Sequence, residues 1–275
     1  MNSSGLEYAD KLVSFGIVTD GTNPANLESV IDSILKQQVD KPEILVIGAI
    51  SAYNSISPHH QSNIEFLEFD ENQKKGWITK KKNLLTKRAS GRYIVFMHDY
   101  VTLHEDWFKF VTQYINYRDF DVAITEVLDY SGNRYFDWVL HPLNYFITDI
   151  FSFPNHLLLP YEVDSLQRLQ YVPGYYFIAK KEFMQKFPLD ENRVWGEGED
   201  VEWSFRWRNE KAKYRFIPKA SARLIKKKET SASEIGRRNV LLLCILTNPL
   251  IFFIHKRIHF DVRRIRRKFG LPDAI

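Results

Sequence analysis

Apolar residues in this chain gather in short runs, separated by segments in which they recur at helical spacing. Residues 26–38 place Leu27, Ile31 and Ile34 on one face of a predicted helix, and a second helix is predicted from about 106 to 117. Strands that alternate with helices indicate an α/β fold with a mainly parallel central sheet and helices on both faces. The apolar runs predicted to be strands are 12–18, 43–50, 64–69, 92–97 and 121–127.

Ligands of such sheets bind beyond the carboxyl ends of the strands, so the segments that follow strands are candidates for chemistry. Three of them are 19–22, 48–51 and 98–100. An Asp in this position, such as Asp99, can bind a divalent metal that carries a diphosphate. The alternative is an ordinary turn, because turns are rich in Asp.

A basic segment, 74–89, is predicted to become helical toward its end. Its cations could neutralise a diphosphate, or they could form the solvated face of a helix. The cations are Lys74, Lys75, Lys80, Lys81 and Lys82, and Asn83 follows them directly.

The pattern changes between residues 130 and 177, where 13 of 48 residues are aromatic and periodicity is poor. Such an insert can be ordinary core or a platform for a substrate, and both interpretations stay open. A strand at 175–179, a helix near 180–187 and a last strand near 213–217 follow.

Four carboxylates crowd the segment WGEGEDVEW, in which Trp195, Gly196 and Gly198 allow a tight turn beside an aromatic wall. If Val201 opens a helix, Glu199 and Asp200 lie at its amino end, where negative charge is favoured. A carboxylate held there stays ionised and can act as a general base. The alternative is a helix cap with a solvated acidic turn. The four carboxylates are Glu197, Glu199, Asp200 and Glu202.

Composition and charge narrow the classes of protein. Hydrophobic residues make up 44% of the 275 residues and charged residues 26%, which excludes disorder over most of the chain. A single cysteine, Cys244, excludes an intrachain disulfide framework and fits a reducing compartment. The amino terminus lacks a basic segment followed by an apolar run, so no signal peptide is expected.

Positive charge is concentrated at the carboxyl end. Residues 236–275 hold nine Lys or Arg against two Asp or Glu, a net of +7, whereas 1–235 hold 29 basic and 32 acidic residues, a net of −3. Within the tail, 239–254 are almost continuously apolar but too few to span a bilayer, which needs about 20 residues. A basic amphipathic helix is predicted over 258–269. The tail is therefore predicted to lie on an anionic membrane, or to pack on the domain as a terminal helix pair.

Four sequence elements in order carry a resemblance over roughly residues 12–225. They are Thr19-Asp20-Gly21 with a helix ending SILKQQ, Lys82-Asn83 with SGRYIVFMHDYV, Gly174 with YYFIAKKEF, and WGEGEDVEWSFR. This arrangement resembles the inverting GT-A glycosyltransferases, in particular the large bacterial family 2. The resemblance implies a Rossmann-like fold that binds nucleotide-diphospho-sugars.

The resemblance also implies roles for individual residues. Asp200 matches the general base that deprotonates the acceptor hydroxyl, with Glu199 and Arg206 in support. Asp99 matches the middle of the metal- and diphosphate-binding triplet, so Mn²⁺ or Mg²⁺ is expected. Residues implied at the donor are Thr19, Asp20, Gly21, Gly48, Lys82, Asn83, His98 and Asp99; those implied at the acceptor are Gly174, Trp195 and Glu197.

Three departures from the family pattern bear on these roles. The second strand ends in Gly48-Ala49, where the family has an Asp that reads the nucleoside, so Asp20 or backbone groups are candidates for that recognition. His98 and Tyr100 replace the flanking acids of the triplet. No histidine occurs in 218–228 to complete a metal shell, and Arg223 or the lysines there could instead hold phosphate.

The expected organisation is a glycosyltransferase domain over 1–235, with a nucleotide-sugar-binding half (12–127) and an acceptor-binding half (128–235), followed by the membrane-associating tail (236–275). The expected partners are a UDP- or GDP-linked sugar as donor, a glycan or polyprenyl-linked acceptor, and an anionic membrane surface. The expected location is cytoplasmic, on the inner face of the plasma membrane. Nucleic acid is not an expected partner, because the body is acidic and carries no nucleic-acid-binding motif. A relative that binds nucleotide sugars or glycans without turnover is the alternative, favoured by the depleted triplet.

Overall fold

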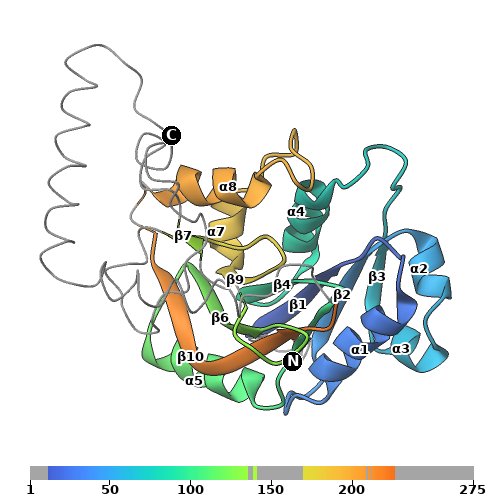
Figure 1. Ribbon diagram of the computed structural model, residues 1–275, viewed down its shortest axis with the longest axis horizontal. Coiled ribbons are helices and arrows are strands. Elements are labelled where there is room, and N and C mark those ends of the chain that lie inside the picture. Colours follow the sequence, from blue (N-terminus) through green and yellow to red (C-terminus); the bar gives the residue numbers. More distant parts are fainter. Residues whose placement is uncertain (1–11, 136–138, 141–169, 209, 211, 227–275) are drawn as a thin grey trace, which may run out of the picture.

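The computed structural model describes residues 12–135, 139–140, 170–208, 210 and 212–226 (Figure 1). Most of the aromatic insert and the whole predicted tail, 236–275, lie outside the described residues. The expectations for those segments are therefore not addressed by the structure.

The first half of the chain alternates strands and helices, as the pattern predicts. Its elements are β1 (Val13–Val18), α1 (Pro24–Leu35), β2 (Glu43–Gly48), α2 (Ile50–Asn54), α3 (Pro58–Ser62), β3 (Glu65–Glu68), α4 (Ile78–Arg88), β4 (Tyr93–His98), β5 (Val101–Leu103), α5 (Trp107–Tyr117) and β6 (Val122–Leu128). The second half contributes β7 (Val139–Leu140), β8 (Gln170–Tyr171), β9 (Tyr176–Lys180), α7 (Lys181–Lys186), α8 (Glu199–Arg208) and β10 (Tyr214–Leu224).

One sheet organises the described residues, with strand order β3-β2-β1-β4-β9-β6-β10-β5. The pairs β1 with β2, β1 with β4, β2 with β3 and β6 with β10 are parallel, so the predicted mainly parallel sheet is confirmed. Strand β9 is antiparallel to both β4 and β6. This reversal brings the residues before β9 next to the carboxyl end of β4.

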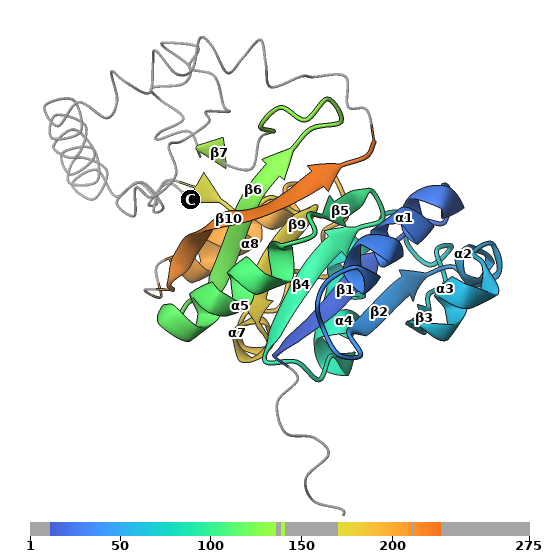
Figure 2. The ribbon, with the colours of Figure 1, turned by 90° about the horizontal axis from the view of Figure 1, so that it is seen from below.

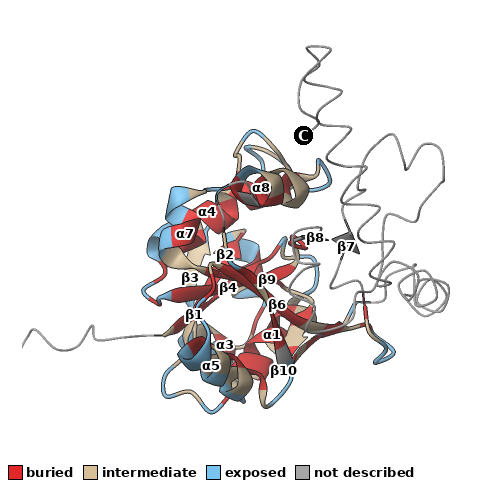
Figure 3. Cartoon of the chain, turned by 90° about the vertical axis from the view of Figure 1, so that its left-hand side faces the viewer, coloured by how far each residue is buried: buried red, intermediate tan, exposed pale blue. Residues whose placement is uncertain are grey.

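Helices cover both faces of the sheet (Figures 2 and 3). Helices α1 and α5 pack on one face through a core that includes Ile31, Val111 and Phe15. Helices α4, α7 and α8 pack on the other face through Leu85, Met184 and Trp203. The β-branched and aromatic residues of the strands are buried between the layers, which is why the apolar runs identified them.

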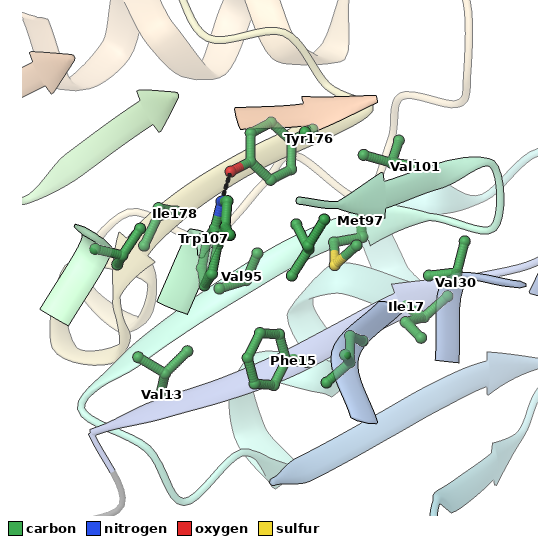
Figure 4. Close-up of a cluster of buried hydrophobic side chains, with 14 of the residues drawn as sticks. Val13, Phe15, Ile17, Val30, Val95, Met97, Val101, Trp107, Tyr176 and Ile178 are labelled. Atoms are coloured by element: carbon green, nitrogen blue, oxygen red, sulfur yellow. Dashed lines mark hydrogen bonds between the residues drawn. The ribbon is translucent and has the colours of Figure 1, made fainter. Parts of the chain in front are cut away.

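A buried hydrogen bond lies at the centre of the core between the sheet and helices α1 and α5 (Figure 4). The indole Nε1 of Trp107 donates to the hydroxyl of Tyr176 over 2.6 Å, and that hydroxyl also pairs with Thr125 Oγ1 at 2.9 Å. Because both polar atoms are satisfied, two large aromatic side chains can be fully buried. They join α5 to β9 and so hold the antiparallel strand in register.

The differences from the predicted elements have local causes. Helix α1 begins at Pro24 because the Asn23 side chain accepts the N–H of Asn26 and the proline occupies the first turn. The predicted strand 43–50 stops at Gly48, and two short helices, α2 and α3, follow. Within the part of the chain that the structure describes, no helix has the length and apolar character needed to cross a bilayer.

Candidate functional site

The carboxyl ends of β1 and β4 are joined by a hydrogen bond between side chains. The buried Thr19 hydroxyl donates to Asp99 Oδ2 over 2.6 Å and accepts the Gly21 N–H over 2.9 Å. The Asp99 N–H donates to Val18 O, which ties the backbones together as well. Thr19, Gly21 and Asp99, which the sequence assigned to the donor, are therefore brought together.

Two carboxylates of this edge have opposite pKa shifts. Burial raises the pKa of Asp99; the Thr19 hydrogen bond opposes the rise and the Asp20 charge adds to it. Burial would also raise the pKa of Asp20, but the hydrogen bonds donated by Thr22 outweigh it and leave that pKa lowered. Asp20 is therefore ionised near neutral pH, and its charge can attract a cation to this edge.

Gly48 allows β2 to approach β1 closely at this edge. A Cβ at this position would lie 2.6 Å from Thr19 Cγ2 and 3.0 Å from Thr19 O. Contacts that short displace backbone or side chains. A side chain at position 48 would therefore collide with the Thr19 that holds Asp99.

Helix α4 buries three consecutive polar residues, which rules out a solvated face for that stretch. Lys81 Nζ donates to Thr19 O over 2.9 Å and also pairs with Glu71. Lys82 Nζ donates to Gly174 O. Asn83 exchanges hydrogen bonds with the Leu189 backbone at 2.9 and 3.0 Å. Both Lys82 and Asn83, assigned to the donor from the sequence, contact the segments around the acidic pair.

Neighbouring cations strengthen that connection between α4 and the loop before α8. Lys80 Nζ lies 2.7 Å from Glu191 Oε2, and Lys74 Nζ donates to Asn192 O over 2.6 Å. The loop is therefore held from one side by basic side chains. Glu191 is a residue that sequence reasoning missed. Lys81 was named only as one member of a run of lysines, and such a run gives no sign of which members are buried.

The acidic pair begins α8, as the charge preference of helix amino ends predicts. Helix α8 starts at Glu199 rather than at Val201. Only 5% of Glu199 is exposed, and burial followed by the Asp200 charge raises its pKa, while Lys82 opposes the rise. Asp200 Oδ2 accepts the Gly174 N–H over 2.8 Å. Gly174, assigned to the acceptor, thus contacts the predicted base directly.

The turn before α8 exposes one large aromatic side chain. The Trp195 side chain is 68% exposed, and the backbone N–H of this residue donates to Gly76 O over 2.8 Å. Gly196 and Gly198 have φ values of +87° and +66°, which glycine adopts without strain. Glu197 Oε2 accepts the Val194 N–H, so this predicted acceptor residue closes its own turn.

Two arginines named from the sequence hold local structure. The Arg206 guanidinium contacts Glu202 through two hydrogen bonds, of 2.9 and 3.0 Å, and donates to Pro188 O. Arg223 donates to Tyr130 O over 2.7 Å. Among the described lysines of 218–228, Lys226 is the one whose charge lowers the pKa of both Asp20 and Asp99.

A divalent cation fits this edge only if a substrate shares in binding it. The described residues contain no group of three or more His, Cys, Asp or Glu side chains that could hold a metal. Mg²⁺ and its analogues, however, are commonly held by one or two carboxylates together with substrate phosphates. Asp99, whose partly buried carboxylate interacts with the Asp20 charge, is the residue that could supply this ligand.

Solved structures with a similar fold include TarS and GalNAc-T7, which are glycosyltransferases of the GT-A type. TarS from S. aureus matches with a TM-score of 0.52 and 12% identity over 86% of this chain and 39% of that chain. A shorter TarS, residues 1–349 in complex with UDP-GlcNAc, matches with a TM-score of 0.55 and 13% identity over 94% and 73% of the two chains. GalNAc-T7 with UDP, GalNAc and Mn²⁺ matches with a TM-score of 0.53 and 14% identity over 79% and 44%.

The sequence comparisons complete the assignment. The chain spans about two fifths of TarS, and a comparison with curated proteins gave no match. The profile of the family described as "Glycosyl transferase family 2" matches residues 17–171, which is more than half of the chain and runs from the end of β1 through β6. The fold is therefore GT-A, as the resemblance implied, and the protein belongs to glycosyl transferase family 2.

Proposed function

We propose that this protein moves a sugar from a nucleoside-diphosphate sugar to a hydroxyl group of a glycan or lipid-linked glycan, with inversion at the anomeric carbon. One observation carries the proposal: adjacent residues connect the acidic pair to the edge that holds Asp99. Gly174 N–H donates to Asp200, and Tyr175 O accepts the N–H of His98 over 3.0 Å. A base and a diphosphate-binding edge are thus neighbours.

Asp200 is suited to remove the acceptor's proton. Its Oδ2 accepts the Gly174 N–H, and its Oδ1 accepts the Val201 N–H over 2.8 Å. Because a carboxylate oxygen has two lone pairs, each oxygen keeps the capacity to accept another proton. As the proton moves to Asp200, the acceptor oxygen bonds to the anomeric carbon. The bond from that carbon to the diphosphate oxygen breaks, and its electron pair leaves with the nucleoside diphosphate.

The donor end of the proposed site consists of Asp99, Thr19, Asp20 and Gly21. A divalent cation shared by Asp99 and the diphosphate would neutralise charge on the leaving group. UDP-linked sugars are the first donors to test, because UDP-GlcNAc and UDP occur in the similar structures. GDP-linked sugars are the second.

The acceptor end is proposed to lie at Trp195. An exposed indole four residues before the acidic pair in the sequence offers an apolar surface for one face of a sugar ring. Residues 12–127 would then form the donor half and 128–235 the acceptor half, with the tail 236–275 bringing the domain to a membrane that carries polyprenyl-linked glycans.

The test is the release of UDP from UDP-GlcNAc and other nucleotide sugars by wild type and Asp200→Asn. We expect the variant to lose about 10²–10⁴ in rate, the scale of a general base, and to keep its affinity for UDP in calorimetry. Glu182→Gln, which changes an exposed carboxylate of α7, is the matched control and should behave as wild type. Wild-type turnover by Asp200→Asn would exclude Asp200 as the base.

A second candidate is a binding protein without turnover. It is favoured by one observation, that Asp99 is flanked by His98 and Tyr100 where the family pattern has acids. Tight UDP binding without UDP release from any nucleotide sugar, in wild type and variant alike, would support it over catalysis.

A further inference from the structure

Lys82 is the charged residue of α4 that is most completely enclosed. Its relative exposure is 0%, its Nζ donates to Gly174 O, and the same nitrogen lies 5.5 Å from the centre of the Phe177 ring. Burying a cation is costly unless it is hydrogen-bonded and paired with opposite charge. The group of opposite charge that pairs with Lys82 therefore indicates the role of this lysine.

The opposite charge is the Glu199–Asp200 pair, on the other side of Gly174. The Gly174 N–H donates to Asp200 Oδ2, so one residue uses its carbonyl for the lysine and its N–H for the carboxylate. A Cβ on Gly174 would lie 3.1 Å from Glu199 Oε1 and 3.2 Å from Asp200 Oδ2. Glycine is thus the residue that lets the backbone approach both carboxylates.

We propose that Lys82 is the positioning residue and counter-charge of the Glu199–Asp200 pair, acting through the Gly174 backbone, and does not contact the donor. The part played by the pair in sugar transfer rests on the function proposed above; the arrangement itself does not. The inference reassigns the lysine from the donor, where sequence reasoning placed it, to the base.

The electrostatics of the site agree with this arrangement. Burial lowers the pKa of Lys82 to about 8, while the charges of Glu199 and Asp200 oppose the fall. At neutral pH the lysine is therefore protonated and faces two carboxylates. Among the described residues, Glu199 interacts electrostatically with Lys82 from α4, with the adjacent Asp200, and with Tyr100 from the turn after β4.

The experiment compares Lys82→Met, which removes the charge, with Lys82→Arg, which keeps it. Lys87→Met, an exposed lysine of the same helix, is the matched control. The first readout is the titration of the Glu199 carboxyl carbon by NMR, assigned through its absence in Glu199→Gln. We expect Lys82→Met to raise the pKa of Glu199 by about 1–3 units, the effect of losing a nearby opposite charge, and Lys82→Arg to leave it close to wild type.

The second readout is UDP affinity by calorimetry, which separates positioning from donor contact. We expect UDP to bind Lys82→Met within about twofold of wild type while UDP release from UDP-GlcNAc falls at least tenfold. An unchanged Glu199 titration, or a tenfold loss of UDP affinity, would overturn the inference.

Two controls keep the result interpretable. If Lys82→Met does not fold, Gly174→Ala tests the same connection with the lysine intact, because its Cβ crowds both carboxylates. UDP release by this variant should fall without loss of UDP affinity. Unchanged UDP release would count against the proposal. If wild type releases no UDP from any nucleotide sugar but Lys82→Met shifts the Glu199 titration, the function proposed above fails and the positioning role stands.

Discussion

At the scale of single residues, Asp99 is held by one hydrogen bond and influenced by several charges. Thr19 fixes its Oδ2, Asp20 disfavours its ionisation and Lys226 favours it. A cation that approaches this partly buried carboxylate would stabilise its charged form. Its function should therefore be visible in the binding of a nucleoside diphosphate.

We expect Asp99→Ala to weaken UDP binding and to remove any dependence of that binding on Mn²⁺. Losing a contact of a charged group costs about 1.5–3 kcal/mol, or roughly 10–100-fold in affinity. Calorimetry of UDP with and without Mn²⁺ measures this, with the exposed Asp40→Ala as control. Equal affinities of Asp99→Ala and wild type in Mn²⁺ would remove Asp99 from the metal and diphosphate site.

The buried lysine gives the reaction an expected pH dependence. Lys82 keeps its proton below about pH 8 and loses it above, because burial lowers its pKa to about 8. We expect kcat/KM of wild type to fall as the pH rises through that value. In Lys82→Arg the fall should be absent, since a guanidinium stays charged. A pH profile of UDP release from 6 to 10 tests both, and the same alkaline fall in Lys82→Arg would assign it to another group.

At the scale of elements, α4 supports the loop that precedes the acidic pair. Asn83 accepts the Leu189 N–H and donates to Leu189 O and to Glu191 Oε1, all within 3.0 Å. These bonds satisfy buried backbone groups that have no water to replace the side chain. The helix thus contributes to the site through the loop.

We expect Asn83→Ala to lower the free energy of unfolding by about 1–3 kcal/mol, because the Leu189 backbone groups lose their partner. Urea unfolding followed by tryptophan fluorescence measures the loss. Lys87→Ala, an exposed position of the same helix, should cost less than about 0.5 kcal/mol. If the two variants are equally stable, the loop does not depend on Asn83.

The elements also show where sequence reasoning succeeds. Strands such as β1 and β4 are buried on both faces, so their continuous apolar runs identify them. The acidic start of α8 was predictable because carboxylates are favoured at a helix amino end. Strand burial and the charge preference at a helix amino end both depend on short stretches of sequence, so the local pattern of residues predicts them.

Other features depend on contacts between distant parts of the chain. The apolar run of β9 indicates a strand but not that the strand pairs antiparallel with both β4 and β6. Strand β5 has three residues, too few for a periodicity. The sequence left open whether the three consecutive lysines bind a diphosphate or form a solvated face. The packing of α4 against Thr19 and Gly174 is what shows that Lys81 and Lys82 are buried.

At the scale of the whole molecule, the described domain and the basic tail pose separate questions. The described residues between 12 and 226 contain the elements of the proposed site, whereas the tail, 236–275, lies outside the described residues. Its sequence carries seven Lys or Arg between Lys256 and Lys268 against Asp261 alone. Such a segment near an anionic surface gains about 1 kcal/mol for each basic residue, and inserted Leu, Ile and Phe side chains of 241–254 would add to it.

We therefore expect the full chain to sediment with phosphatidylglycerol liposomes and a chain truncated after Ser233 to stay in solution. Binding should weaken as salt rises, because screening limits the attraction to about 10 Å at 0.1 M. Phosphatidylcholine liposomes are the control for charge, and UDP release to a soluble acceptor should be equal in both chains. Equal sedimentation of the two chains would mean that the tail does not bind the membrane. A truncated chain that fails to fold would instead place the apolar run 239–254 in the core, where it would support the domain and not its attachment.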